Sequence, residues 1–117
     1  MTGIGTLGRE AVRTLPESAV VWVNGRQASI ARISPNGATS TCELERGLEG
    51  EPAYLAGVVR AIGDCERVVI LGPGSARLAL EREYVAVYHR PERLVDVEPA
   101  GPMTRVELVE RLRALVD

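Results

Sequence analysis

Two short stretches of the chain are apolar at nearly every position, residues 20–24 and 67–71. A strand with one face in water alternates apolar and polar residues, whereas a strand buried on both faces is a continuous apolar run. We therefore expect these two strands to be neighbours at the centre of one sheet.

Turn residues divide the first half of the chain into three strands, at 20–24, 27–34 and 38–45. Asn24-Gly25 is a strong hairpin signal because both residues tolerate positive φ, and Pro35-Asn36-Gly37 indicates a second turn. The third strand puts Thr39, Thr41 and Glu43 on one face and Ser40, Cys42 and Leu44 on the other, so we expect it at an edge of the sheet. This pattern predicts a three-stranded antiparallel meander.

The second half alternates helices and strands. Helical spacing of apolar residues predicts a helix over 53–62 and another over about 75–88, although residues 84–88 also alternate like a strand. A strand at 94–98 carries Asp96 and Glu98, so we expect it at an edge. Thr104 and Glu107 form a capping box that opens a last helix, whose inward residues are predicted to be Val109, Leu112 and Val116.

These elements give the order β-β-β-α-β-α-β-α. They predict an α/β fold with a mixed five-stranded sheet in the order 3-2-1-4-5 and helices on both faces, with right-handed crossovers in the parallel part. The 117 residues suit one domain. We expect residues 1–18 to be a flexible arm and residues 19–117 to be the folded domain.

Composition excludes several classes of protein. Hydrophobic residues make up 45% of the chain and phenylalanine is absent, so an aliphatic core is expected. No apolar run is long enough for a membrane span and no signal pattern opens the chain, so we expect a cytoplasmic protein without membrane contact. Cys42, Cys65 and the single histidine His89 cannot form a Cys/His zinc site; the two cysteines are expected to be partly buried free thiols.

Two glycine motifs suggest nucleotide binding without meeting its requirements. Gly3, Gly5 and Gly8 spell G-x-G-x-x-G, but no strand precedes them, so no nucleotide cofactor is expected. The corner 72–74, Gly-Pro-Gly, is too short for a phosphate-binding P-loop and has no lysine. It follows a central parallel strand and precedes a helix N-terminus, where anions bind. Two interpretations stay open, a structural turn or contact with an anion such as an RNA phosphate.

Three segments resemble one family: "VVWVNGRQASIARI", "ERVVILGPGSARLAL" and "RLVDVEPAGPMTRVELVERLRAL". Together they are similar to the middle domain of archaeal and eukaryotic class-I peptide-release factors and Pelota, and to small bacterial stand-alone translational machinery proteins. The resemblance covers about residues 19–117. It implies a ribonuclease-H-like fold, shared with two ribosomal proteins, and a role in translation.

The chain departs from that family where release factors act. Their Gly-Gly-Gln motif lies in the loop after the third strand, whereas this loop reads "RGLEGEP" and the only glutamine, Gln27, lies beside the first hairpin. Peptidyl-tRNA hydrolysis is therefore not expected. Arg77 stands where relatives usually carry a lysine after Gly-Pro-Gly, which keeps a positive charge there.

Enzymatic activity is not expected, because the carboxylates do not converge on a metal pair and a helix C-terminus explains His89. We expect a non-catalytic translation-associated module that binds the ribosome or structured RNA, without metal or cofactor. All fourteen basic residues are arginines, which bind phosphates well. The predicted phosphate-binding set is Arg26, Gly72, Gly74, Ser75, Arg77, Arg90 and Arg93.

Two alternatives remain open for these residues. The net charge is only −2, so the arginines could instead form ordinary surface ion pairs with the sixteen acidic residues. Ser75 could act simply as the N-cap of its helix. The alternative function is a homodimeric protein–protein interaction domain without RNA contact, formed through the edge of the third strand or through an amphipathic segment at 7–15.

Overall fold

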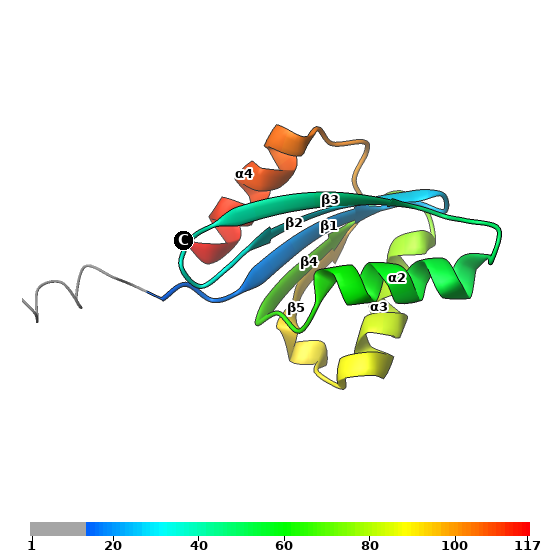
Figure 1. The fold of residues 1–117 in the computed structure, drawn as a ribbon, viewed down its shortest axis with the longest axis horizontal. Coiled ribbons are helices and arrows are strands. Elements are labelled where there is room, and N and C mark those ends of the chain that lie inside the picture. The colour runs from blue at the N-terminus through cyan, green and yellow to red at the C-terminus, as the bar shows by residue number, and fades with distance from the viewer. Residues whose placement is uncertain (1–13) are drawn as a thin grey trace, which may run out of the picture.

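The fold is a five-stranded sheet with helices on both faces (Figure 1). A computed structural model describes residues 14–117. Its strands and helices, with one short 3-10 turn, are β1 (Ser18–Val23), β2 (Gln27–Ile33), β3 (Thr39–Glu45), α2 (Glu51–Ile62), β4 (Arg67–Leu71), α3 (Ala76–Tyr88), η1 (Pro91–Arg93), β5 (Leu94–Glu98) and α4 (Arg105–Val116).

The sheet has the strand order β3-β2-β1-β4-β5, which confirms the predicted topology. β1 pairs antiparallel with β2 and parallel with β4. β2 pairs antiparallel with β3, and β4 pairs parallel with β5. The carboxyl ends of β1, β4 and β5 therefore meet at one end of the sheet, which we call the carboxyl end; the opposite end is the amino end.

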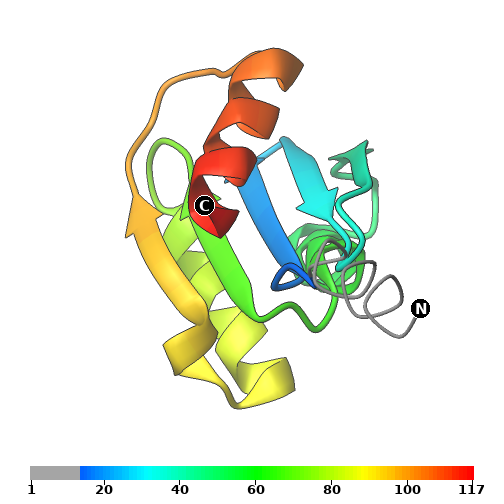
Figure 2. The same ribbon diagram turned by 90° about the vertical axis from the view of Figure 1, so that its left-hand side faces the viewer.

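The centre of the sheet is buried on both faces, as its apolar runs predict. Every residue of β1 is buried, and so is β4 after its first residue. One face packs against α2 and α3, and the other packs against α4 (Figures 1 and 2). Burial of aliphatic side chains in these two cores supplies most of the driving force for folding.

The last helix buries Leu112, as predicted, and also Leu108, which the prediction omitted. Leu108 and Leu112 are buried against the sheet, whereas Val109 and Val116 pack only at the margin of this core. The capping box of Thr104 and Glu107 is present, with both reciprocal hydrogen bonds. Because the box fixes where the helix starts, Leu108 comes one turn after Thr104 and faces the sheet.

Residues 84–88 are helical rather than extended, so the strand interpretation of this segment is wrong. Tyr84 is fully buried against the α2 and α3 core. Its ring lies 4.8 Å from that of Tyr88, centroid to centroid. A spacing of four residues brings these two rings together only in a helix, so packing decides between two patterns that the sequence left open.

The described chain begins shortly before the first strand. The predicted arm covers residues 1–18, of which 1–13, including Gly3, Gly5, Gly8 and most of segment 7–15, lie outside the described residues. Leu15 packs beside the α4 core and its N–H donates to the Pro35 carbonyl at 2.9 Å. Ser18 is already part of β1. None of the helices between residues 14 and 117 is long and apolar enough to cross a bilayer.

Candidate functional site

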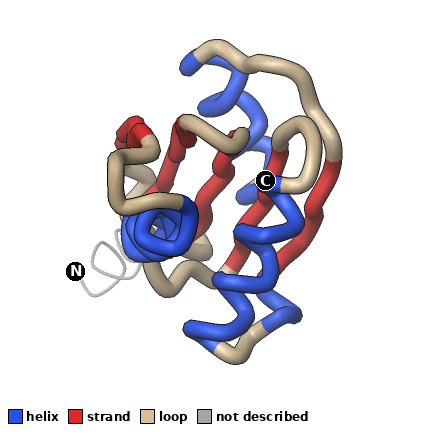
Figure 3. Tube along the Cα trace, turned by 90° about the vertical axis from the view of Figure 1, so that its right-hand side faces the viewer, coloured by secondary structure: helices blue, strands red, loops and turns tan. Residues whose placement is uncertain are grey.

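Four chain connections lie at the carboxyl end of the sheet (Figure 3). They are the β1–β2 hairpin at 24–26, the β3–α2 loop at 46–50, the Gly-Pro-Gly corner that follows β4 and the β5–α4 connection at 99–104. Open α/β sheets usually bind ligands at this end, because the loops leave the strands there and diverge. The candidate functional site is therefore expected among these connections.

The hairpin turn is held in shape by the side chain of Asn24. Its Oδ1 atom accepts hydrogen bonds from the backbone N–H groups of Arg26 and Gln27, both at 2.8 Å. The Asn24 N–H donates to the Gln27 carbonyl at 3.0 Å. A side-chain amide that satisfies backbone donors in this way fixes a turn without any core packing. Arg26 is consequently presented to solvent at the tip.

The β3–α2 loop is bonded directly to this hairpin. The backbone N–H of Arg46 donates to the Arg26 carbonyl at 2.7 Å, and its Nη1 atom donates to the Gly25 carbonyl at 3.4 Å. Tyr54, in the first turn of α2, donates its hydroxyl proton to the Asn24 carbonyl at 3.0 Å. Burial raises the pKa of Tyr54 to about 12, although the charge of Arg46 opposes the shift. The phenol therefore remains a neutral donor at physiological pH.

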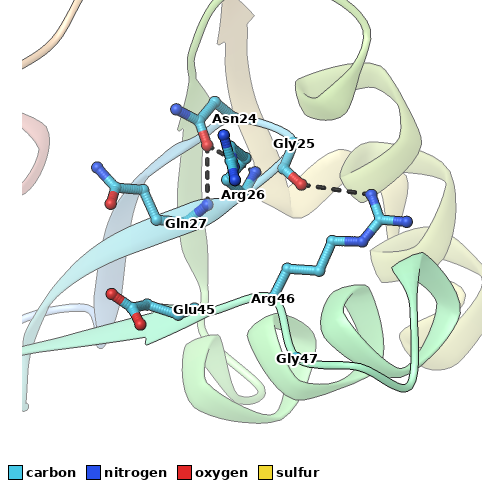
Figure 4. A pocket seen from close by; sticks show the side chains of 7 residues that line it. All are labelled: Asn24, Gly25, Arg26, Gln27, Glu45, Arg46 and Gly47. Carbon is cyan, nitrogen blue, oxygen red and sulfur yellow. Dashed lines mark hydrogen bonds between the residues drawn. The ribbon is translucent and has the colours of Figure 1, made fainter.

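An open groove of about 680 Å³ lies between the hairpin and the loop (Figure 4). Among residues 14–117, neither Arg26 nor Arg46 makes a salt bridge. The one carboxylate in the lining is that of Glu45, and in Figure 4 the guanidinium of Arg46 points away from it. Both arginines therefore keep free N–H donors in a groove of mixed polarity. The lining residues are Asn24, Gly25, Arg26, Gln27, Glu45, Arg46 and Gly47.

The Gly-Pro-Gly corner is packed against the end of β1. Gly72 has φ +150°, and a Cβ atom on it would lie 1.9 Å from the Val23 carbonyl oxygen. Only glycine fits such a close approach of two backbones. Arg77 folds back on the corner, and its Nη1 atom donates to the carbonyls of Gly72 at 3.3 Å and Gly74 at 2.7 Å. These contacts favour the structural-turn interpretation of the corner.

Ser75 does not cap the helix that follows, so that interpretation of its role is wrong. The residue has φ −92° and ψ −11°, and its side chain makes no capping hydrogen bond. A capping serine has an extended backbone conformation, which aims its hydroxyl at the N–H groups of the first turn. Ser75 is already in the helical region, because the corner turns the chain one residue earlier. Its side chain is exposed beside Gly74.

The predicted phosphate-binding residues do not form one patch. Arg26, Gly72, Gly74, Ser75 and Arg77 lie at the carboxyl end, and the other two, Arg90 and Arg93, lie at the amino end.

The two predicted arginines at the amino end, Arg90 and Arg93, both have carboxylate partners. Arg93 pairs with Asp64 and also donates to the Cys65 carbonyl at 3.3 Å. Arg90 lies 3.8 Å from Glu92. Arg90 and Arg93 therefore form ion pairs with acidic residues, as the alternative to phosphate binding predicted.

The sequence-based site omitted Arg46 and Tyr54. Arg46 is the first residue of the loop "RGLEGEP", and Tyr54 lies in the helix predicted over 53–62. The predicted strand order could have identified Arg46, because a strand that pairs antiparallel with β2 must end beside the β1–β2 turn. Arg46 is therefore adjacent to Arg26 in any sheet with this order.

Other reactive groups lie apart from the groove. Cys42 is exposed, so the expectation of partial burial is wrong for it, and Cys65 is fully buried. Burial raises the pKa of the Cys65 thiol. Between residues 14 and 117 no cluster of three His, Cys, Asp or Glu side chains suits a metal ion. Asp64 lies in the connection between α2 and β4, whereas Asp96 lies within β5.

Comparison with known proteins finds similarity in structure only. No protein family and no curated protein matches the sequence. The fold is similar to Pelota of Archaeoglobus fulgidus, with a TM-score of 0.65 and 18% sequence identity, over 98% of this chain and 37% of that protein. It is also similar to Pelota of Thermoplasma acidophilum, with a TM-score of 0.62 and 22% identity, over 97% of this chain and 38% of that one. The chain thus spans little more than a third of either Pelota protein and has a fold found in them.

Proposed function

We propose that this protein is a non-catalytic module of translation that binds the ribosome or structured RNA through the carboxyl end of its sheet. The observation that carries the proposal is the groove in which Arg26 and Arg46 lie side by side without a carboxylate partner among the described residues. Guanidinium groups donate paired N–H bonds to phosphate oxygens, so two adjacent arginines suit a local phosphate contact.

The translational setting is supported by two observations together. The three segments quoted above resemble release-factor and Pelota middle domains, and the fold is similar to that of two Pelota proteins. The proposal assigns phosphate contact to Arg26 and Arg46. It assigns Gly72, Gly74 and Arg77 to the framework, because Arg77 is bonded to the carbonyls of the corner.

The absence of catalysis is part of the proposal and is supported by the composition of the groove. Its described lining contains no histidine, cysteine, serine or tyrosine hydroxyl, and Glu45 is its single carboxylate. Acid–base or nucleophilic catalysis normally needs a base next to a nucleophile or a second acid. A groove lined by arginine, amide and glycine is better suited to binding.

The test is co-sedimentation of the full chain with ribosomes and separated subunits over a salt series. Phosphate contacts make binding fall steeply with salt, with a slope of roughly 0.7 to 0.9 for each contact in log–log form. The double variant Arg26→Glu, Arg46→Glu should lose retention at low salt. The single variants Arg26→Gln and Arg46→Gln should each lower the slope by about one contact.

Arg90→Glu is the matched control, because Arg90 is equally exposed but lies at the opposite end of the sheet. This variant should be retained like the wild type. Equal loss in Arg90→Glu and in the double variant would show a diffuse charge effect and would remove the groove from the proposal. If the wild type is not retained at any salt concentration, the proposed binding to the ribosome is wrong.

A further inference from the structure

The strand β3 is exposed to an unusual degree for part of a sheet. Six of its seven residues are exposed, and Leu44 alone is half-buried. β3 is the first strand in the sheet order, so within residues 14–117 only β2 pairs with it. An edge strand presents a row of unpaired N–H and C=O groups that another strand can use.

The other edge of the sheet is protected by contrast. β5 has a register irregularity opposite Val68 and Val69, which disrupts a straight edge. Arg111 of α4 donates to Glu98 at 3.0 Å and lies 3.8 Å from Asp96, so a helix side chain holds this strand. Within β3 there is no proline, no basic side chain and no bulge in its pairing with β2.

The register of β3 determines which of its peptide groups face outward. At its two ends, Ala38 accepts a hydrogen bond from Ser34, and Arg46 donates one to Arg26. Both bonds join even-numbered residues of the β3 side to the neighbouring strand, and antiparallel pairing alternates residue by residue. The outward N–H and C=O groups therefore belong to Thr39, Thr41, Glu43 and Glu45.

We propose that β3 pairs antiparallel with β3 of a second copy of this chain, about a two-fold axis at Cys42. In this register the outward residues meet each other: Thr41 faces the partner's Glu43, and Thr39 faces the partner's Glu45. Four such pairs, each exchanging two N–H···O bonds, give about eight intermolecular hydrogen bonds. All seven residues of the strand are paired, and the two sheets join into one.

Charge supports a second copy as the occupant. Each glutamate of β3 lies opposite a threonine, so no like charges face one another directly, which is the arrangement that destabilises a sheet. The whole chain carries a net charge of only −2, and long-range repulsion between copies is therefore weak. The groove of Arg26 and Arg46 lies at the end of each β3, and its lining residue Glu45 is also the last residue of the proposed strand pairing.

The two-fold register places Cys42 opposite the partner's Cys42 as a non-hydrogen-bonded pair. Such pairs have Cα atoms about 4.5 Å apart, within the range of about 4.4 to 6.8 Å that a disulfide spans. Ser40 lies on the same face but pairs with the partner's Leu44. Two copies of residue 40 are then about 13 Å apart along the strand, too far for a disulfide. In this register a cysteine at position 42 can therefore form an intermolecular disulfide with its copy, whereas a cysteine at position 40 cannot.

The first test is cross-linking of the full chain by diamide, which accepts two electrons and two protons as two thiols form a disulfide. The wild type should give a dimer on a non-reducing gel. Cys65 is fully buried and stays a thiol. The double variant Cys42→Ser, Ser40→Cys has an equally exposed thiol on the same face, and it should cross-link at least about tenfold more slowly. Equal rates for the two proteins would overturn the proposed register.

The second test changes charge at Thr41, whose cross-strand partner in β2 is the uncharged Ala31. Thr41→Glu puts two like-charge pairs into the dimer and should weaken dimerisation by about two- to thirtyfold, whereas Thr41→Lys should strengthen it. Sedimentation velocity across a concentration series measures both. A wild type that stays monomeric at all concentrations, or two variants that dimerise equally, would overturn the proposal and leave the edge to a different partner.

Discussion

Two arginines at the amino end of the sheet and the two in the groove at its carboxyl end have different surroundings. At the amino end, Arg32 lies 2.5 Å from Glu17 and Arg93 pairs with Asp64. At the carboxyl end, Arg26 and Arg46 have no carboxylate partner among the described residues. Paired arginines hold elements of the fold together, whereas unpaired ones keep their donors for a ligand. The same residue type therefore has two roles, and only the neighbours distinguish them.

A tyrosine stabilises each end by the same kind of bond. Tyr54 donates to the Asn24 carbonyl at the carboxyl end, and Tyr84 donates to the Gly63 carbonyl at the amino end, both at 3.0 Å. Burial raises the pKa of both tyrosines to about 12. Each end of the sheet therefore has one tyrosine that donates a hydrogen bond to a backbone carbonyl. The difference between them lies in the charged side chains on the surface.

The largest effect is expected from Gly72→Ala, which tests whether the carboxyl end has a rigid framework. The new Cβ atom would lie 1.9 Å from the Val23 carbonyl oxygen, and β1 is too deeply buried to move away. We expect a loss of more than about 4 kcal/mol in the free energy of unfolding, measured by urea denaturation.

Gly74→Ala is the matched control in the same corner. A Cβ atom at Gly74 meets nothing within 4 Å, and only its φ of +66° is unfavourable. Its cost should be about 1 to 2 kcal/mol. If the two substitutions cost the same, the close approach of the corner to β1 does not limit stability.

The second prediction concerns alkaline pH and both tyrosines. Their folded pKa of about 12 exceeds the ordinary value of 10.0, so the stability they contribute is complete below pH 10 and is lost as the pH rises from 10 to 12. At pH 11 the loss should be about 1 kcal/mol for each tyrosine. Urea midpoints at pH 8 and pH 11 measure it.

Tyr84→Phe and Tyr54→Phe separate the two contributions. Each variant is expected to be less stable at pH 8, because a buried carbonyl loses its donor. Each should also lose less stability than the wild type between pH 8 and pH 11. An unchanged pH dependence in both variants would assign the alkaline loss to other groups.

The fold was predictable because its main signals are local. The continuous apolar runs of β1 and β4 identify the central strands, and Asn24-Gly25 identifies the hairpin whose geometry Asn24 enforces through its own side chain. The ambiguous segment 84–88 was settled by the burial of Tyr84, which depends on α2 and on the sheet. Periodicity within five residues contains no information about such distant contacts.

The candidate site was only partly predictable, because it depends on pairing between distant residues. Arg93 and Asp64 are 29 residues apart, and no local pattern shows that they form an ion pair. Arg77 is close to Gly74 in sequence, but its bonds to the corner carbonyls depend on the backbone path of Gly72. Arg46 could have been found from the predicted strand order alone, since β3 must end beside the β1–β2 turn.

The smallest effect, and the most direct test of the comparison between the two ends, comes from replacing one arginine at each end. Arg93→Gln removes an ion pair and a bond to the Cys65 carbonyl, so it should cost about 1 kcal/mol, or roughly 3 to 6 °C in Tm, and leave ribosome retention unchanged. Arg46→Gln should change stability by less than about 0.5 kcal/mol and weaken retention. Calorimetry and co-sedimentation on the same two proteins measure both quantities. If Arg46→Gln is the less stable protein, or Arg93→Gln the weaker binder, the division between a stabilising and a binding end is wrong, because each arginine would then act in the role assigned to the other.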